Sequence, residues 1–217
     1  MSEEKERSQS YFDGKFWPFL GWTLLAGLII SVSLGIAAPW AVCMLNRWYC
    51  KHKVVNGRRM MFNGKGGELF GKYIIWFLLS IVTFGIYSFV AAVKLVKWET
   101  EHIHFEDAPE ESLSMFDGKF WPYWGWTILA ALISSVSFGI ATPWAIVMLD
   151  NYLIPHQVID GKRLTFDGKG GQLFGKYIIW FLLTIVTFGI YGLVLPIKML
   201  RWETEHISFE ELEAPQE

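Results

Sequence analysis

Long uncharged stretches alternate with short polar segments along this chain. Four stretches contain no Asp, Glu, Lys or Arg: residues 16–45, 73–93, 120–149 and 177–197. An apolar run of about 18 residues or more is typical of a membrane segment, since about 20 helical residues cross the hydrocarbon core. The pattern therefore predicts a mainly α membrane protein built from four apolar helical units.

Each uncharged stretch is interrupted by glycine in a Ser/Thr-x-Gly-Ile sequence. The four helix-break turns are expected at Gly35, Gly85, Gly139 and Gly189. Glycine favours the left-handed backbone found at helix ends, and a nearby hydroxyl can bond the freed backbone groups. Each unit is therefore either one kinked helix that spans the membrane or a helical hairpin folded at the glycine.

Charge and length point in different directions on this choice. Kinked spans divide the 19 Lys and Arg residues almost equally between the two sides, whereas hairpins place all of them on one side. The arms of the second and fourth hairpins would hold about 11–16 residues, or roughly 16–24 Å. That is shorter than a bilayer core of about 30 Å, so the bilayer would thin or the turn would stop short of the far surface. The charge argument favours hairpins, and kinked spans remain the alternative.

Short strands are predicted between the helical units. Asn56-Gly57 and Asp160-Gly161 lie between alternating residues, and both turn residues accept a positive φ, which indicates β-hairpins on the cytoplasmic side. Residues 102–116 contain a looser version of the same pattern. We expect the remaining segments, 9–12 and 206–209, to pair and close a pseudo-fourfold ring.

Internal repetition sets the domain organisation. Residues 12–105 align without a gap with residues 116–209 at an offset of 104, and a weaker period of 50 runs inside each half. The predicted segments are a polar N-terminal segment (1–11), repeat 1 (12–105, with units 12–61 and 62–105), an acidic linker (106–115), repeat 2 (116–209, with units 116–165 and 166–209) and an acidic C-terminal tail (210–217).

Composition narrows the possible functions. Apolar residues make up 53% of the chain, charged residues only 18%, and the net charge is −2, which does not indicate nucleic-acid binding. The two cysteines, Cys43 and Cys50, form neither a disulfide framework nor a zinc motif. The N-terminal segment is polar and mixed in charge, so we expect a mature N-terminus rather than a targeting peptide.

Three short motifs carry a family resemblance. Phe-Asp-Gly precedes an apolar helix at 12–14 and 116–118, Thr-Phe-Gly-Ile-Tyr occupies 83–87 and 187–191, and Gly-Ile-Ala-x-Pro-Trp occupies 35–40 and 139–144. Over residues 10–209 the chain resembles the YjgN-like domain of unknown function found in bacterial inner-membrane proteins. The resemblance implies a multi-pass protein of the bacterial inner membrane. It implies no activity and no functional residues. Both topologies, hairpins and kinked spans, independently predict cytoplasmic termini.

One chemically versatile residue follows the repeat through all four units. His52, His102, His156 and His206 are equivalent, and Glu99 and Glu203 stand three residues before two of them. Imidazole titrates near neutral pH, so these six residues form a candidate polar ring around a cation path. The alternative is that each imidazole caps a helix end or bonds a strand carbonyl. We predict no metal site, because the Glu-x-x-His spacing falls where the helices leave the membrane.

Functional expectations follow from these absences and repeats. Since no catalytic triad, nucleotide loop or metal quartet is present, we expect no enzymatic activity and no cofactor. The predicted role is an oligomeric inner-membrane assembly, either a pore or a membrane-shaping scaffold, whose partners are membrane lipid and further copies of the chain. The alternative is a small secondary transporter, although ionisable residues in mid-membrane, which mark such proteins, are missing.

Overall fold

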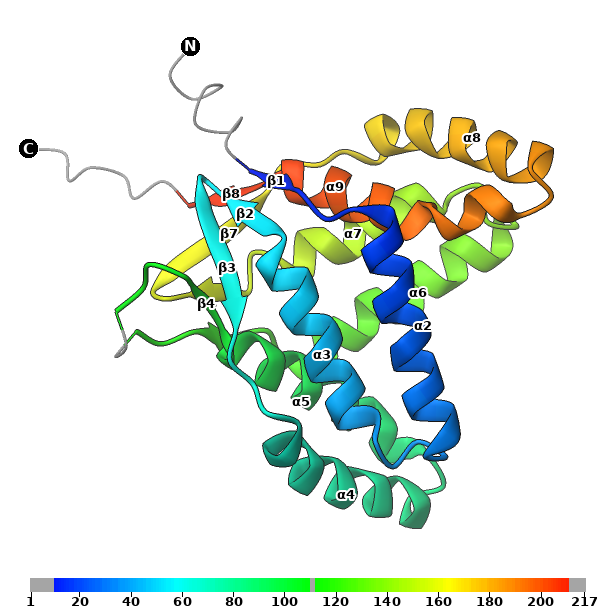
Figure 1. Cartoon of the computed structure of the whole chain (residues 1–217). Coiled ribbons are helices and arrows are strands. Elements are labelled where there is room, and N and C mark those ends of the chain that lie inside the picture. Colours follow the sequence, from blue (N-terminus) through cyan, green and yellow to red (C-terminus); the bar gives the residue numbers. More distant parts are fainter. Residues whose placement is uncertain (1–9, 110–111, 211–217) are drawn as a thin grey trace, which may run out of the picture.

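The computed structural model describes residues 10–109 and 112–210. The N-terminal segment up to residue 9, residues 110–111 of the acidic linker and the tail from residue 211 lie outside the described residues, as do the predictions made for them. Two sheets lie on the side of both chain ends, and helical hairpins extend away from them (Figure 1).

Each repeat unit contributes one pair of helices. An outgoing helix starts directly after Lys15, Lys65, Lys119 or Lys169, where the backbone is still extended. The pairs are α2 (Phe16–Val32) with α3 (Ala38–Lys51), α4 (Gly66–Val82) with α5 (Ile86–Glu101), α6 (Phe120–Val136) with α7 (Thr142–Leu153), and α8 (Gly170–Val186) with the 3₁₀ helix η1 (Ile190–Leu193) and α9 (Leu195–Glu205). We call these four helical hairpins the arms.

The helix ends show why each unit folds back. At the end of α2, Leu34 and Gly35 both have positive φ, at 51° and 88°, and the Gly35 N–H donates to the Ile30 carbonyl at 2.8 Å. This six-to-one bond closes a Schellman-type helix end. The hydroxyl of Ser33 then accepts the Ala37 N–H at 3.0 Å, which starts the return segment. The same turn recurs at Gly85, Gly139 and Gly189, so each unit is a helical hairpin rather than a kinked span.

Helix length overturns the predicted fold class. The longest helices have 17 residues, or about 25 Å, against about 30 Å for a bilayer core. Within residues 10–109 and 112–210, no helix combines the length and apolarity needed to cross a membrane. The prediction of a mainly α membrane protein is therefore wrong, and so are the transmembrane, multi-pass, channel and inner-membrane predictions, including the cytoplasmic placement of termini and hairpins. The glycine turn divides each uncharged stretch into two helices, as the hairpin alternative expected, and neither helix is long and apolar enough to cross a membrane.

The protein is instead a mixed α/β structure with two antiparallel four-stranded sheets. One sheet has the order β1-β2-β3-β4 and the other β5-β6-β7-β8. Their strands are β1 (Tyr11–Phe12), β2 (Lys53–Val55), β3 (Arg58–Phe62), β4 (Ile103–Phe105), β5 (Met115–Phe116), β6 (Gln157–Ile159), β7 (Lys162–Phe166) and β8 (Ile207–Phe209). We call the two sheets and their connecting turns the platform.

Local strand pairing follows the prediction and distant pairing does not. The β2–β3 and β6–β7 hairpins are confirmed, with Asn56-Gly57 and Asp160-Gly161 at positive φ. The predicted pairing of 9–12 with 206–209 is wrong, because β1 pairs with β2 and β8 with β7. The looser hairpin expected in 102–116 is also absent, since β4 pairs with β3 and β5 with β6. The strands expected to pair with each other instead flank the central hairpin of their own half, so β1 and β8 are edge strands of different sheets.

Side-chain contacts close the ring instead of strand pairing. Phe12 and Phe19 of the first unit pack with Ile197 of α9 and with Trp48 in one buried cluster. The Arg201 guanidinium also donates to the Gly14 carbonyl at 2.9 Å. The last unit is thereby held against the first.

The two halves exchange contacts through their β-turns. The Asp160 carboxylate accepts the Phe105 N–H at 2.6 Å and the Ser112 hydroxyl at 2.7 Å. At the equivalent position the Asn56 side-chain oxygen accepts the Phe209 N–H at 3.3 Å. The largest buried cluster, which includes Val55, Phe105, Ile159 and Ile207, draws on both sheets. The main core therefore lies in the platform, between the halves.

Candidate functional site

The four histidines end the return helices in one repeated geometry. Each Nδ1 lies 2.6–2.8 Å from the carbonyl oxygen four residues earlier, so this nitrogen donates one hydrogen bond. Each ring also packs on the aromatic side chain of that earlier residue, with centroids 4.3–4.6 Å apart. Carbonyls of the last helical turn have no intrahelical partner, so this arrangement caps the helix. The geometry matches the capping alternative for His52, His102, His156 and His206.

Glu99 and Glu203 lie in a different place from the histidine rings, in a polar cluster between return helices. The Asn46 amide donates to Glu99 at 2.7 Å, and the Lys53 ammonium lies 3.4 Å from Glu203. Asp150 interacts electrostatically with Glu203 and Lys53. We call these two groups together the polar centre: Asn46 with Glu99, and Lys53 with Asp150 and Glu203. Their members come from α3, β2, α5, α7 and α9, and therefore from all four units.

Two carboxylates of the polar centre, Glu99 and Asp150, have raised pKa values. Burial raises the pKa of Glu99, although the hydrogen bond from Asn46 acts in the opposite direction. Burial and the neighbouring charge of Glu203 raise the pKa of Asp150 to about 7, against the opposing charge of Lys53. Within the described residues, no group of three or more His, Cys, Asp or Glu side chains is arranged to hold a metal ion.

Sequence reasoning found two members of this centre and missed three. Asn46 and Asp150 occupy equivalent positions at the offset of 104, each directly after a long uncharged stretch. A polar residue repeated at that point was an available signal. Lys53 could not be placed in the same way, because its equivalent is the uncharged Gln157.

The glycine turns hold the most unusual side chains of the molecule. The residue before each glycine is large, apolar and almost fully exposed: Leu34 at 91%, Phe84 at 98%, Phe138 at 95% and Phe188 at 98%. All four also have φ values near +50°, a conformation that is unfavourable for a bulky side chain. The fold therefore holds four apolar side chains outward at the ends of the arms, in spite of backbone strain. We call these four residues the tips.

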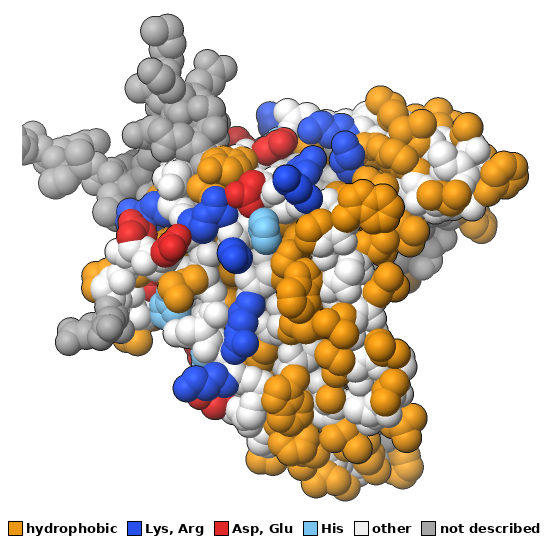
Figure 2. Space-filling model, in the orientation of Figure 1, with side chains coloured by type: hydrophobic (Ala, Val, Ile, Leu, Met, Phe, Trp, Pro, Cys, Tyr) orange, Lys and Arg blue, Asp and Glu red, His pale blue; other side chains and the backbone are white. Residues whose placement is uncertain are grey.

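Apolar surface continues from the tips along the arms. Figure 2 shows hydrophobic side chains gathered over the helical hairpins, and Lys, Arg, Asp and Glu gathered near the sheets. Val32, Ile36, Val82 and Ile86 flank two of the tips and are exposed, as are their counterparts in the second half. A monomeric protein in water rarely exposes a continuous apolar surface of this extent. An exposed apolar surface of this extent is typical of a site that contacts another protein or a lipid.

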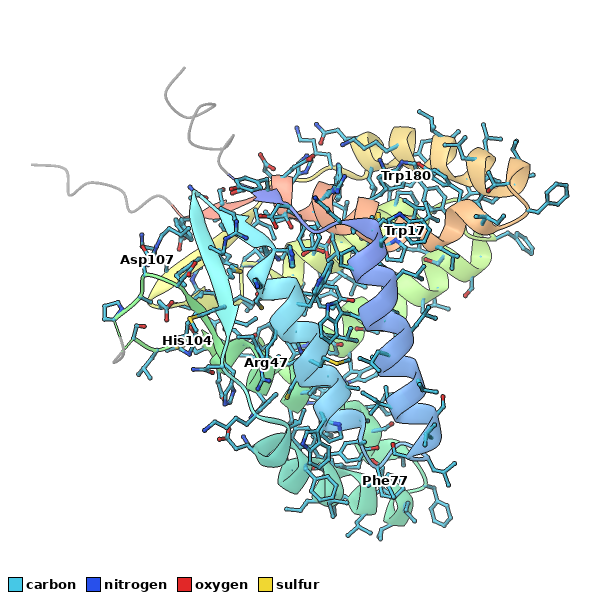
Figure 3. The ribbon with its side chains drawn as sticks, in the orientation of Figure 1. Trp17, Arg47, Phe77, His104, Asp107 and Trp180 are labelled. Carbon is cyan, nitrogen blue, oxygen red and sulfur yellow. The ribbon has the colours of Figure 1, made fainter. Side chains whose placement is uncertain are left out.

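Aromatic side chains mark the boundary between the two surfaces. Trp17 (Figure 3) and its counterpart Trp121 are exposed in the first turns of α2 and α6, which follow the Lys15 and Lys119 caps. Tryptophan combines an apolar ring with a polar N–H and is enriched where apolar and aqueous phases meet. On α2 and α6, the lysine cap, the exposed tryptophan and then apolar residues therefore follow one another from the platform towards the tips. Lys94 of α5 departs from this order, because its ammonium lies 2.7 Å from the Tyr87 hydroxyl.

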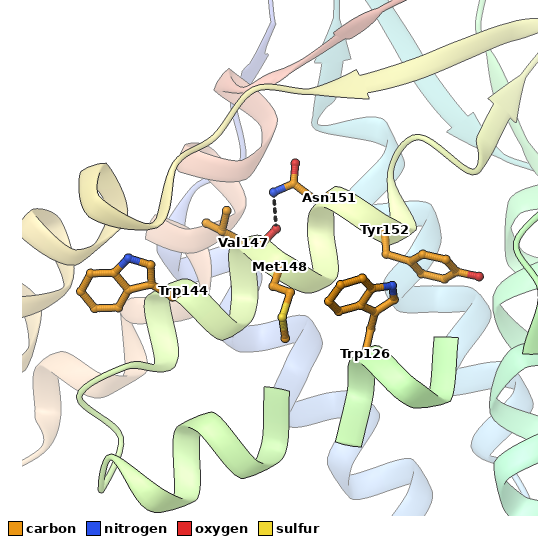
Figure 4. Close-up of a pocket in the computed structure, with 6 residues that line it drawn as sticks. All are labelled: Trp126, Trp144, Val147, Met148, Asn151 and Tyr152. Atoms are coloured by element: carbon orange, nitrogen blue, oxygen red, sulfur yellow. Dashed lines mark hydrogen bonds between the residues drawn. The ribbon is translucent and has the colours of Figure 1, made fainter. Parts of the chain in front are cut away.

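A surface hollow of about 430 Å³ interrupts the third unit (Figure 4). Its wall consists of Trp126, Trp144, Val147, Met148, Asn151 and Tyr152. At the position of Asn151, two other units carry an arginine that donates to a glycine carbonyl of the next unit: Arg47 to Gly64 and Arg201 to Gly14. Asn151 instead donates to Val147 in its own helix. The hollow is thus a place where a shorter side chain leaves a junction open, and no carboxylate, imidazole or thiol lines it.

Comparison with known proteins adds one similarity. The model of the family described as "Bacterial protein of unknown function (DUF898)" matches residues 57–111, which run from the turn of the first β-hairpin through α4, α5 and β4. No curated protein and no solved structure matches the chain. The second unit is therefore similar to this bacterial family.

Proposed function

We propose that the chain is a lipid-binding scaffold without catalytic activity, whose arms enter one leaflet of a bilayer while the platform stays in water. The four exposed tips carry this proposal. An exposed phenylalanine in strained backbone is unfavourable in water, and it becomes favourable when an apolar phase surrounds the side chain.

The tips supply an adequate driving force. Full burial of one large apolar side chain contributes about 1.5–3 kcal/mol, so four tips contribute about 6–12 kcal/mol. The flanking apolar residues of each arm add to this value. One tip alone would bind lipid only weakly, and the repetition of the unit therefore matters.

Helix length determines how deeply the arms enter. Helices of 17 residues are about 25 Å long, so the tips reach into the hydrocarbon without crossing it. The exposed Trp17 and Trp121 would then lie at the head-group level, and the charged platform above it. Insertion of four helical hairpins from one side adds volume to one leaflet, which supports a role in bending or thinning the bilayer.

The family resemblance fits the same proposal. The matched segment is a single unit, and the other three units repeat its turn sequence and its exposed tip. We infer that the YjgN-like resemblance extends to those units by duplication. Self-association on the bilayer remains a prediction, which chemical cross-linking of vesicle-bound protein would test.

Vesicle flotation tests the proposal directly. Purified protein is mixed with phosphatidylcholine–phosphatidylglycerol vesicles and centrifuged through a density gradient, and the floating fraction is measured. The tip variant carries Leu34→Asn, Phe84→Asn, Phe138→Asn and Phe188→Asn, because asparagine is polar and tolerates positive φ. The matched control carries Met61→Ser, Leu113→Ser and Met115→Ser, which removes exposed apolar side chains from the platform and its linker.

We expect the wild type and the control to float with the vesicles and the tip variant to remain at the bottom. Equal flotation of the tip variant and the wild type would refute the proposal. Uptake of a solute into sealed vesicles would instead favour the transporter alternative.

A further inference from the structure

The second arm contains an apolar groove next to the first. A hollow of about 350 Å³ lies between α3, α4 and α5. Its wall consists of Ala38, Pro39, Val42, Leu69, Tyr73, Trp76, Phe77, Ser80, Ser88, Ala91, Ala92 and Leu95. Figure 3 shows Phe77 on this hairpin. The groove opens on the surface of the arm, and it is therefore reachable from the apolar phase proposed above.

Small side chains make the groove hollow. Ala38, Ser80, Ser88, Ala91 and Ala92 leave space that larger residues would fill. The few hydroxyls in the wall already have acceptors, because Ser80 donates to Trp76, Ser88 to Gly85 and Tyr73 to Gly35. The wall therefore offers apolar contact and no free hydroxyl donor, which is suited to a hydrocarbon chain.

The second half shows what this space accepts. Leu195 and Met199 stand where the first half has Ala91 and Leu95. Both pack against a cluster that contains Leu173 and Trp180, the equivalents of Leu69 and Trp76. Trp180 is only 8% exposed, whereas Trp76 is half-buried. The protein's own aliphatic side chains occupy this part of the second half, and the first half lacks the leucine.

We propose that the groove binds one acyl chain of a bilayer lipid, in the place that Leu195 takes in the second half. The inference rests on the lipid-binding role proposed above and names one specific contact within it. The groove is continuous with the exposed apolar surface of the arm through Phe77. Lys72 is exposed next in sequence to the lining residue Tyr73, so a cation lies on the same arm for a head-group phosphate.

Photolabelling in vesicles tests the inference. The protein is bound to phosphatidylcholine–phosphatidylglycerol vesicles that contain a phosphatidylcholine with a diazirine in its acyl chain, irradiated, and mapped by mass spectrometry. We expect adducts concentrated on the facing walls of α4 and α5. The Ala91→Leu variant fills the groove, so labelling there should fall by about tenfold, in line with the cost of forcing extra volume into a packed site.

Three further variants sharpen the result. Ala92→Leu fills the same groove from a second position, in case Ala91→Leu disturbs folding, which circular dichroism monitors. Leu195→Ala should create a new labelled site beside Trp180. Gly71→Leu adds the same side chain to the outer face of α4, where a Cβ meets nothing within 4 Å, and it should leave groove labelling unchanged.

Each remaining outcome overturns the inference. Labelling spread evenly over all four arms and unaffected by Ala91→Leu would show general contact with the bilayer only. A cross-link from this groove to a second copy of the chain would show that the groove is occupied by protein and not by an acyl chain. If the wild type does not float, the proposed function fails, and a diazirine fatty acid added in buffer without vesicles tests the groove by itself. Absence of groove labelling by that probe then overturns the inference as well.

Discussion

Phe105 and Phe84 represent the two regions of this molecule. Phe105, in β4 of the platform, is 1% exposed. The centroid of its ring lies 5.4 Å from the centroid of the Phe209 ring and 4.3 Å from Cζ of Arg58. Phe84, at the tip of the second arm, is 98% exposed. The same side chain therefore belongs to a core in one region and to an outer surface in the other. Residue type alone does not determine whether a phenylalanine is buried or exposed, because this depends on what surrounds the side chain.

The hydrogen bonds of the two regions differ in the same way. Asp160 and Asn56 join residues that are distant in sequence and belong to opposite halves. At the turns of the arms, the hydroxyls of Ser33 and Thr83 bond the backbone within four residues. The platform thus holds the chain together over long distances, and each arm maintains only its own shape. Stability should depend on the platform, and lipid binding on the arms.

The largest expected difference in stability is between the alanine variants of these two phenylalanines. Phe105→Ala should lower the free energy of unfolding by about 3–5 kcal/mol, because it leaves a cavity in the shared core. Phe84→Ala should change it by less than about 0.5 kcal/mol, because an exposed side chain loses little contact. Urea unfolding followed by circular dichroism measures both. Equal losses for the two variants would contradict the division into platform and arms.

The next largest loss of stability is expected when the Asp160 contact between the two halves is weakened. Asp160→Asn should lower the free energy of unfolding by about 2–3 kcal/mol, since charged hydrogen bonds to Phe105 and Ser112 are weakened. Burial opposes ionisation of Asp160, but bonds from Phe105, His104 and Ser112 hold its pKa below the usual value. The stabilisation is therefore present at neutral pH and lost as pH falls through the lowered pKa.

Asn56 is the matched control for that contact. It occupies the equivalent turn and accepts a longer bond of 3.3 Å from Phe209. Asn56→Gly removes this acceptor and keeps the positive φ of the turn, so it should cost less than Asp160→Asn. A smaller loss at Asp160 than at Asn56, measured by the same urea unfolding, would show that charge does not strengthen the contact.

The smallest expected change in stability is at Asp150 in the polar centre, and this change should depend on pH. The pKa of Asp150 is raised to about 7, so between about pH 4 and 7 the folded chain holds a proton that the unfolded chain releases. The contribution of Asp150 to the free energy of unfolding is therefore fully present at low pH, and it is lost as pH rises through 7. Asp150→Asn should leave stability near pH 4 unchanged and raise it by about 1–2 kcal/mol at pH 8.

The first half provides the reverse substitution. Asn46→Asp places a carboxylate beside Glu99, where the wild type has an amide donor at 2.7 Å, so it should destabilise the protein at pH 8 and less at pH 4. Thermal unfolding at the two pH values compares both variants. Parallel pH profiles for wild type and Asp150→Asn would exclude a raised pKa at this position.

The features that could be predicted from the sequence depend on short motifs or on the internal repeat. The Asn56-Gly57 turn needs only two residues with positive φ, and the arms need only a glycine after a helix, so both features follow from short motifs. The repeat also brought Glu99 and Glu203 forward, and they do lie in a polar cluster. Pairing of distant strands and the partners of Asp160 depend on the whole fold, and no local pattern specifies them.

The main error arose because one signal has two structural meanings. An uncharged stretch of 30 residues, such as 16–45, satisfies the rule for a spanning helix, but its turn at Gly35 makes two helices of 17 and 14 residues. Phe84 was missed for a related reason. Hydropathy treats it as one more apolar residue in a run, whereas its position directly before the turn glycine determines that it is exposed.

The exchange of β-turns between the halves has an evolutionary consequence. Asp160 accepts from Phe105 as Asn56 accepts from Phe209, so each half completes the other through the same pair of positions. Before the duplication that created the present chain, two separate copies of one half would have met through this self-complementary contact, which is the geometry of an isologous dimer. A chain that contains both copies keeps this contact within one molecule, so its two turns can differ, as Asp160 and Asn56 do.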